Sequence, residues 1–287
     1  MTTYTPECGS KGHILFVHGG PGSHSAYFEA ALTTFPAYHE RMPYGWVCYD
    51  QRGCGRSGPS ASVSHQGNID DLAALVRTLG ATDDTAPIAL LGHSYGSWLL
   101  YDTLRQHPEL VRKAVFVGRA LDQRLSRVRS LLMDLLLLKL DQPDDYAQIR
   151  PTVGTETNPF LAAHREIIAR MRFREKRNRF YWGNLEAMQW YEGVKQQSAV
   201  KENDTVMRAV ADSLYQMTGP LGEFDFRALP TSVLLVNGFH DFLMGGETPP
   251  ISAGVPYAIL PGSGHYPHFE EPDRFVDLLV KFLEEQP

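Results

Sequence analysis

The pentapeptide GHSYG at residues 92–96 constrains the fold more than any other segment of the chain. An apolar run, residues 88–91, precedes it, and a helix-like stretch, residues 97–105, follows it. This order predicts a strand that turns sharply into a helix, because the two glycines let the backbone turn without side-chain collisions. A serine on such a turn exposes its hydroxyl at the end of the strand, so Ser94 is the candidate nucleophile.

A second glycine-rich turn, HGGPG at residues 18–22, follows the apolar run 14–17. A hydroxyl that attacks a carbonyl creates a negatively charged oxygen, which needs N–H donors that are already in position. A backbone N–H in this turn can supply one, since no Cβ blocks the approach, and the N–H of Tyr95 supplies the other. We expect the first donor to be Gly20, with Gly19 as the alternative. An ordinary strand-to-helix turn is the competing interpretation.

An acid and a histidine each follow an apolar run near the end of the chain. Asp241 comes after residues 233–236, and His265 comes after residues 257–260. The chain order Ser94, Asp241, His265 is the order of the catalytic triad in α/β-hydrolases and differs from other serine hydrolase folds. In such a triad the histidine takes the serine proton and passes it to the leaving group. The aspartate orients the imidazole and stabilises its charged form.

Other residues compete for these roles. His268 lies three residues beyond His265, but the sequence after it is typical of the start of a helix, which makes it the weaker candidate base. Asp225 precedes its strand instead of following it, so it is a poor alternative to Asp241. His240 and His93 are expected to pack around the site.

With these residues identified, the chain resembles the α/β-hydrolase superfamily and, within it, the proline iminopeptidase-like group. The matching motifs are residues 18–22, residues 50–57 (DQRGCGRS), Ser97 after the elbow and residues 264–267 (GHYP). The resemblance implies a serine aminopeptidase that releases an N-terminal residue, often proline, from a peptide, amide or arylamide by an acyl-enzyme mechanism. The alternative is an esterase, thioesterase or lactonase of a biosynthetic or catabolic pathway, because the same triad serves those reactions.

The resemblance also implies that acidic side chains of a cap bind the substrate amine. Residues 187–193 (AMQWYEG) are similar to the cap segment in which an aromatic residue precedes Glu-Gly. We therefore expect Glu192 to anchor the amine, Glu186 to assist from one helical turn earlier, and Trp190 to contact the substrate. A solvated helix carboxylate is the competing interpretation of Glu192.

Alternation of apolar runs and helical patterns predicts an α/β fold, with a mostly parallel, doubly wound sheet covered by helices. This pattern occupies residues 1–118 and 226–287, which we expect to form the α/β-hydrolase core. It stops over residues 119–225, which predict an inserted helical cap, or lid. The leucine-rich segment 131–138 is too short to cross a bilayer. We expect it to pack on the core or line the pocket, with a dimer contact as the alternative.

Composition limits the partners. The 287 residues carry a net charge of -6 without a basic cluster, which argues against nucleic acid and anionic membranes. Three cysteines, Cys8, Cys48 and Cys54, are too few for a disulfide framework, and no metal-ligand spacing occurs. We therefore expect no metal and no cofactor, and a small-molecule or short-peptide substrate. Residues 1–10 lack the pattern of a signal peptide, which favours the cytoplasm; the oligomeric state stays open.

Overall fold

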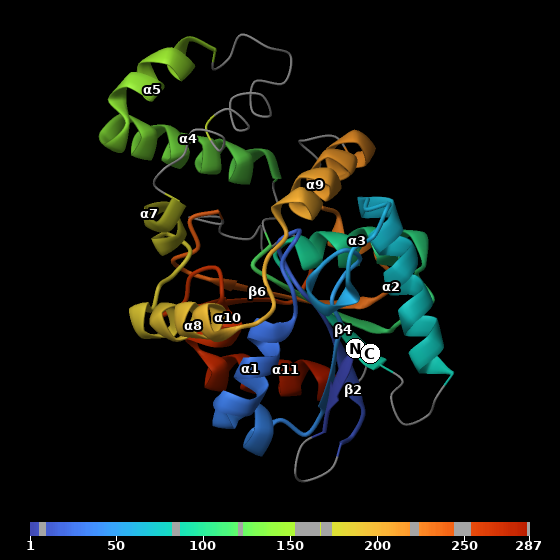
Figure 1. Ribbon diagram of the computed structural model, residues 1–287. Coiled ribbons are helices and arrows are strands. Elements are labelled where there is room, and N and C mark those ends of the chain that lie inside the picture. Colours follow the sequence, from blue (N-terminus) through green and yellow to red (C-terminus); the bar gives the residue numbers. More distant parts are fainter. Residues whose placement is uncertain are drawn as a thin grey trace.

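A seven-stranded sheet forms the centre of the molecule (Figure 1). The computed structural model describes residues 1–5, 10–81, 87–119, 123–152, 167, 174–218, 224–243 and 254–285. The strands are β1 (Thr2–Tyr4), β2 (His13–Val17), β3 (Gly45–Cys48), β4 (Pro87–His93), β5 (Lys113–Val117), β6 (Ser232–Gly238) and β7 (Tyr257–Leu260). Of the three cysteines, Cys48 and Cys54 are buried free thiols, and Cys8 lies outside the described residues.

The strand order is β1-β3-β2-β4-β5-β6-β7, and β1 alone runs antiparallel to its neighbour. The other strand pairs are parallel, which confirms the predicted α/β fold with a mostly parallel sheet. The sequence does not predict strand β1, because three residues are too few to show an alternating pattern. It forms through pairing with β3, where Thr3 lies opposite Val47.

Alternate residues of each central strand point to opposite faces of the sheet. In β2, Ile14 and Phe16 pack in one buried cluster, whereas Leu15 and Val17 pack in the other. Helices α1 (Ala26–Thr34) and α11 (Pro272–Glu284) cover the first face, and α2 (His65–Gly80) and α3 (Tyr95–Gln106) cover the second (Figure 1). Helices on both faces explain why these strands read as continuous apolar runs.

The remaining helical elements are shorter or lie in the region predicted to be a cap. They are η1 (Ala37–Arg41), η2 (Gly55–Ser57), α4 (Gln123–Asp141), α5 (Pro143–Ile149), η3 (Arg150–Thr152), α7 (Arg174–Arg179), α8 (Leu185–Gln197), α9 (Asp204–Thr218), η4 (Phe226–Ala228) and α10 (Pro267–Glu270). In the described part of the chain, no helix combines the length and apolarity needed to cross a membrane.

Between β5 and β6 the described elements are all helical. Helices α8 and α9 pack on the core through Tyr191 and Val210, respectively. The leucine-rich segment forms α4, which packs with α5 in a separate small cluster that includes Leu138 and Ile149. Figure 1 shows α4 and α5 at the top of the molecule, away from the sheet. The exact boundaries of the cap, residues 119–225, remain a prediction.

Both glycines of the elbow stand where a side chain has no room. A Cβ on Gly92 would lie 2.6 Å from the Gly96 carbonyl oxygen, and a Cβ on Gly96 would overlap the Val17 carbonyl oxygen. The first turn of α3 therefore rests directly on the end of β2. This close approach is what the two glycines make possible.

We expect Gly96→Ala to lower the free energy of unfolding by about 3 kcal/mol, since the added methyl must displace the β2 backbone. Gly193→Ala is the matched control, because a Cβ at this position in α8 meets nothing within 4 Å. It should raise the free energy of unfolding by about 0.5–1 kcal/mol through helix propensity. Urea denaturation of both variants tests this, and equal effects would contradict it.

Candidate active site

Ser94 lies at the carboxyl edge of the sheet, where β4 turns into α3, and opens onto a cavity of about 390 Å³. Its φ is 54°, and among the described residues it is the one non-glycine residue with a positive φ. Its N–H donates to the Val117 carbonyl at 2.9 Å, so β5 supports the turn. A strained, sharply turned serine at this place is the geometry expected of a nucleophile elbow.

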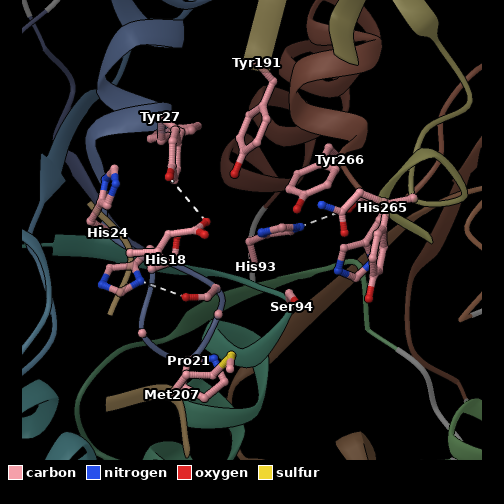
Figure 2. A pocket seen from close by; sticks show the side chains of 18 of the residues that line it. His18, Pro21, His24, Tyr27, His93, Ser94, Tyr191, Met207, His265 and Tyr266 are labelled. Atoms are coloured by element: carbon pink, nitrogen blue, oxygen red, sulfur yellow. Dashed lines mark hydrogen bonds between the residues drawn. The ribbon is translucent and has the colours of Figure 1, made fainter. Parts of the chain in front are cut away.

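Asp241 and His265, far apart in the sequence, are hydrogen-bonded to each other. The His265 Nδ1 lies 2.6 Å from the Asp241 Oδ2, and both side chains are buried. Since a carboxylate only accepts, Nδ1 donates and Nε2 is the nitrogen able to take a proton. The Leu243 N–H donates to the other Asp241 oxygen at 3.0 Å. His265 and Ser94 line the same cavity (Figure 2).

The predicted oxyanion loop is anchored through His18, a residue to which the sequence analysis gave no separate role. The His18 Nδ1 donates to the Gly19 carbonyl at 2.9 Å, and its Nε2 accepts from the Gln51 N–H at 3.0 Å. The Gln51 amide donates in turn to the His18 carbonyl at 2.7 Å. Burial lowers the pKa of His18 to about 4, which keeps the imidazole in the neutral form that these bonds require.

Gly19 and Gly20 both line the cavity. A Cβ on Gly19 would lie 3.1 Å from the Ser94 Cβ, so Gly19 packs directly on the candidate nucleophile. Gly20 follows with φ 119°, a conformation that favours glycine. Tyr95 begins α3, so its N–H is one of those that a helix leaves unpaired in its first turn. Gly19 and Tyr95 therefore adjoin Ser94, and Gly20 lines the same cavity.

Two further histidines surround His265. The His93 Nε2 donates to the His265 carbonyl at 2.9 Å, and the two rings are 5.0 Å apart. The His268 ring lies 4.6 Å from that of His93. Burial lowers the pKa of His93 well below its usual range and that of His268 to about 3. Neutral imidazoles next to His265 avoid a like charge when that residue takes up a proton.

The weaker candidates take other positions. His268 lines the cavity, but Asp241 contacts His265 instead. Asp225 accepts from the Arg227 N–H at the start of η4, and it is absent from the described lining of the cavity. His240 is exposed.

A buried carboxylate, Glu270, connects the histidine loop to the segment before α8. Its two oxygens accept from the N–H groups of Gly183 at 2.6 Å, Asn184 at 2.8 Å, Gly264 at 2.8 Å and Tyr266 at 3.1 Å. Burial raises the pKa of Glu270, and the four bonds oppose that rise. Glu270 thus holds both neighbours of His265 against the segment before α8.

The predicted amine-binding residues do not meet at the cavity. Glu192, Glu186 and Trp190 are absent from its described lining. Trp190 packs against Phe35 and Phe269, with ring centres 4.6 and 5.5 Å away. The reason is helical register: successive residues of a helix point about 100° apart, and α8 turns Tyr191 into the cavity in place of its neighbours.

The cavity instead contains residues that the sequence gave no reason to select. Tyr27, Tyr191 and Tyr266 direct their hydroxyl groups into it (Figure 2). The Tyr27 hydroxyl donates to the Glu202 carboxylate at 3.4 Å. Phenol rings and one carboxylate make this wall of the cavity attractive to a cation.

Glu202 is positioned by the residue beside it. The Asn203 N–H donates to the Gly22 carbonyl at 2.8 Å, and the Asn203 side-chain amide donates to the Gly53 carbonyl at 3.1 Å. The first bond fastens the start of α9 to the oxyanion loop, and the second fastens it to the segment 50–57. No sequence periodicity marks residues 201–204, which explains why Glu202 was missed.

No three acidic, histidine or cysteine side chains of the described residues come together as a set of metal ligands.

Three comparisons with known proteins bear on this site. The model of the alpha/beta hydrolase family matches residues 14–278. A proline iminopeptidase of Saccharolobus solfataricus is 24% identical over 298 residues, with 96% of this chain and 86% of the relative covered. A solved proline iminopeptidase-related protein of Thermus thermophilus is similar with a TM-score of 0.67 and 17% identity, covering 95% of this chain and 89% of that one.

An esterase of Exiguobacterium antarcticum is similar in structure with a TM-score of 0.59 and 18% identity, covering 99% of each chain. At such identities the solved structures establish the shared fold alone, and they include more than one chemistry.

The buried histidines predict a pH-dependent stability. Unfolded histidine has a pKa near 6.5, whereas the pKa of His18 is about 4 and that of His268 about 3. Between pH 7 and pH 5 the unfolded chain therefore takes up protons that the folded chain does not. Each such histidine should lower the free energy of unfolding by about 2 kcal/mol over this range.

We expect His268→Leu to reduce this acid-induced loss by about 2 kcal/mol, whatever its effect on stability at pH 7. Urea denaturation at pH 7 and pH 5 measures the difference. The same loss in variant and parent would contradict the assignment.

Proposed function

The chain belongs to the alpha/beta hydrolase family, and from this premise we propose that it is a serine hydrolase acting through an acyl-enzyme on a small amide or short peptide. The supporting observation is one cavity that contains the Ser94 side chain, His265 with its bond to Asp241, and the carboxylate of Glu202. A volume of about 390 Å³ suits a small substrate.

In the proposed mechanism the Ser94 hydroxyl attacks the substrate carbonyl while His265 Nε2 accepts its proton. The developing oxyanion receives hydrogen bonds from the Tyr95 N–H and from the N–H of Gly20 or Gly19. His265 then gives the proton to the leaving amine or alcohol, which departs and leaves an acyl group on Ser94. Water then gives a proton to His265 and attacks the acyl carbon, the bond to the Ser94 oxygen breaks, and His265 returns the proton to that oxygen. Asp241 stabilises the imidazolium in both steps.

We propose further that the acyl group carries a free amine, as in an aminopeptidase of the proline iminopeptidase type, and that Glu202 anchors this amine in place of Glu192. Glu202 lines the cavity beside the rings of Tyr27 and Tyr191. Its side chain is 34% exposed and pairs with the Lys195 ammonium at 3.2 Å. An ion pair this open to solvent contributes little, so a substrate ammonium can replace it at small cost.

Replacing Ser94 by alanine should lower kcat at least about 10³-fold on every ester or amide that the parent cleaves, since no acyl-enzyme can form. The variant should also resist labelling by a fluorophosphonate. Steady-state kinetics and mass spectrometry provide the two measurements. Unchanged turnover in the variant would exclude Ser94 as the nucleophile.

For the amine anchor, we expect Glu202→Gln to lower kcat/KM for an aminoacyl arylamide about 10- to 100-fold, because a charged hydrogen bond is lost. The same variant should cleave the N-acetylated arylamide or a simple aryl ester as the parent does. Glu192→Gln makes the identical change outside the cavity and should spare both substrates.

The panel also separates the competing functions. If the parent prefers simple acyl esters and gains nothing from a free amine, the esterase alternative replaces the aminopeptidase. A selective loss in Glu192→Gln would instead restore Glu192 as the anchor.

A further inference from the structure

A second buried chain of hydrogen bonds lies beneath the elbow, on the face of the sheet opposite α1 and α11. The Asp102 carboxylate lies 2.9 Å from the His65 Nε2, and the His65 Nδ1 lies 2.9 Å from the Tyr95 hydroxyl oxygen. The Asn68 side-chain amide donates to the same hydroxyl oxygen at 3.1 Å. Both His65 and Tyr95 are buried, with exposures of 0% and 5%.

The donor and acceptor roles from Asp102 to Tyr95 form one consistent series. The Asp102 carboxylate only accepts, so the His65 Nε2 donates to it. The Nδ1 then accepts from the Tyr95 O–H, and the Tyr95 oxygen accepts from Asn68. These buried bonds restrain His65 and the Tyr95 hydroxyl, because another rotamer of either side chain would leave a buried polar group unpaired.

This series of hydrogen bonds ends at Tyr95, whose backbone N–H is a proposed oxyanion donor. Tyr95 follows the strained Ser94 and is the first residue of α3. Its backbone N–H is the donor expected to face the oxyanion, while its side chain reaches down to His65. Fixing the side chain therefore restrains rotation of the peptide that carries the donor.

His65 also contacts the region predicted to be the cap. It begins α2, and its N–H donates to the Ser213 hydroxyl of α9 at 2.6 Å. The route Ser213, His65, Tyr95 thus joins a helix that covers the cavity to the first turn of α3.

We propose that Asp102, His65 and the Tyr95 hydroxyl are positioning residues for the oxyanion hole, holding the Tyr95 N–H at the place where negative charge develops. This inference depends on the proposed serine hydrolase function. The three residues act through the backbone of Tyr95, because none of their side chains is among the described residues that line the cavity.

The test is Tyr95→Phe, which removes the hydroxyl and keeps the ring. We expect kcat to fall about tenfold with KM unchanged, because a small displacement of the donor weakens binding of the transition state more than of the substrate. Affinity for an arylboronic acid, which forms a tetrahedral adduct with serine, should fall by a similar factor. Rates are expressed per site titrated with fluorophosphonate, so that unfolded protein does not count.

Tyr101→Phe is the matched control. Tyr101 lies in the same helix and is buried. Its hydroxyl accepts a hydrogen bond from the Asp225 N–H at 3.1 Å, and the substitution removes this bond. It should lower the melting temperature without changing kcat per titrated site. Equal losses of kcat in the two variants would show that the Asp102–His65–Tyr95 hydrogen bonds contribute only to stability, and would overturn the proposal.

A second variant, His65→Leu, interrupts the chain at its centre. If the Asp102–His65–Tyr95 hydrogen bonds act as one unit, the double variant that combines His65→Leu with Tyr95→Phe should lose no more kcat than the more impaired single variant. Multiplicative losses, or full kcat in Tyr95→Phe, would refute it. Failure of the parent to cleave any ester or amide would instead refute the proposed function, so the two failures are distinguishable.

Discussion

The parallel register of the central strands is the constraint on which the site depends. Val17 of β2 lies opposite Gly92 of β4, and His93 lies opposite Val117 of β5. The register continues through β6 to β7, where Gly238 pairs with Leu260. Because parallel strands end at the same edge of a sheet, the loops that follow them meet there although they are far apart in sequence. The contact between Asp241 and His265 follows from this register.

The region predicted to be the cap provides one side of the cavity, which includes Tyr181, Tyr191 and Glu202. Its contribution depends on a few polar contacts with the core: the Asn203 N–H on the Gly22 carbonyl, and Glu270 on the backbone before α8. The first bond holds the segment of Glu202 against the loop of proposed oxyanion donors, and Glu270 holds the segment before α8 against the loop that carries His265.

The sequence was sufficient for the parts of the structure that depend on local pattern. Apolar runs located β2, β4, β6 and β7, and the helix-like stretch after Ser94 located α3. The glycines around Ser94 predicted a turn whose close packing the structure now explains. The loop positions of Asp241 and His265 could be predicted because each follows a buried strand.

Features that depend on how helices and loops dock against each other could not be predicted from the sequence. Tyr191 rather than Glu192 faces the cavity, a difference of one residue on a helix whose docking angle no local pattern encodes. Glu202 belongs to a short polar segment, and the bonds of Asn203 to Gly22 and Gly53, which are distant in sequence, place it at the cavity. The Asp102–His65–Tyr95 chain joins three polar residues that look unrelated in sequence.

Glu270 has a consequence for exchanging parts between relatives of this chain. One carboxylate satisfies amide groups from two segments that are about 80 positions apart, Gly183–Asn184 and Gly264–Tyr266. A chimera that joins this segment before α8 to a core without an acceptor at position 270 would leave these four amides without their carboxylate partner. The region predicted to be the cap and the loop that carries His265 are therefore best exchanged together, with residue 270 included.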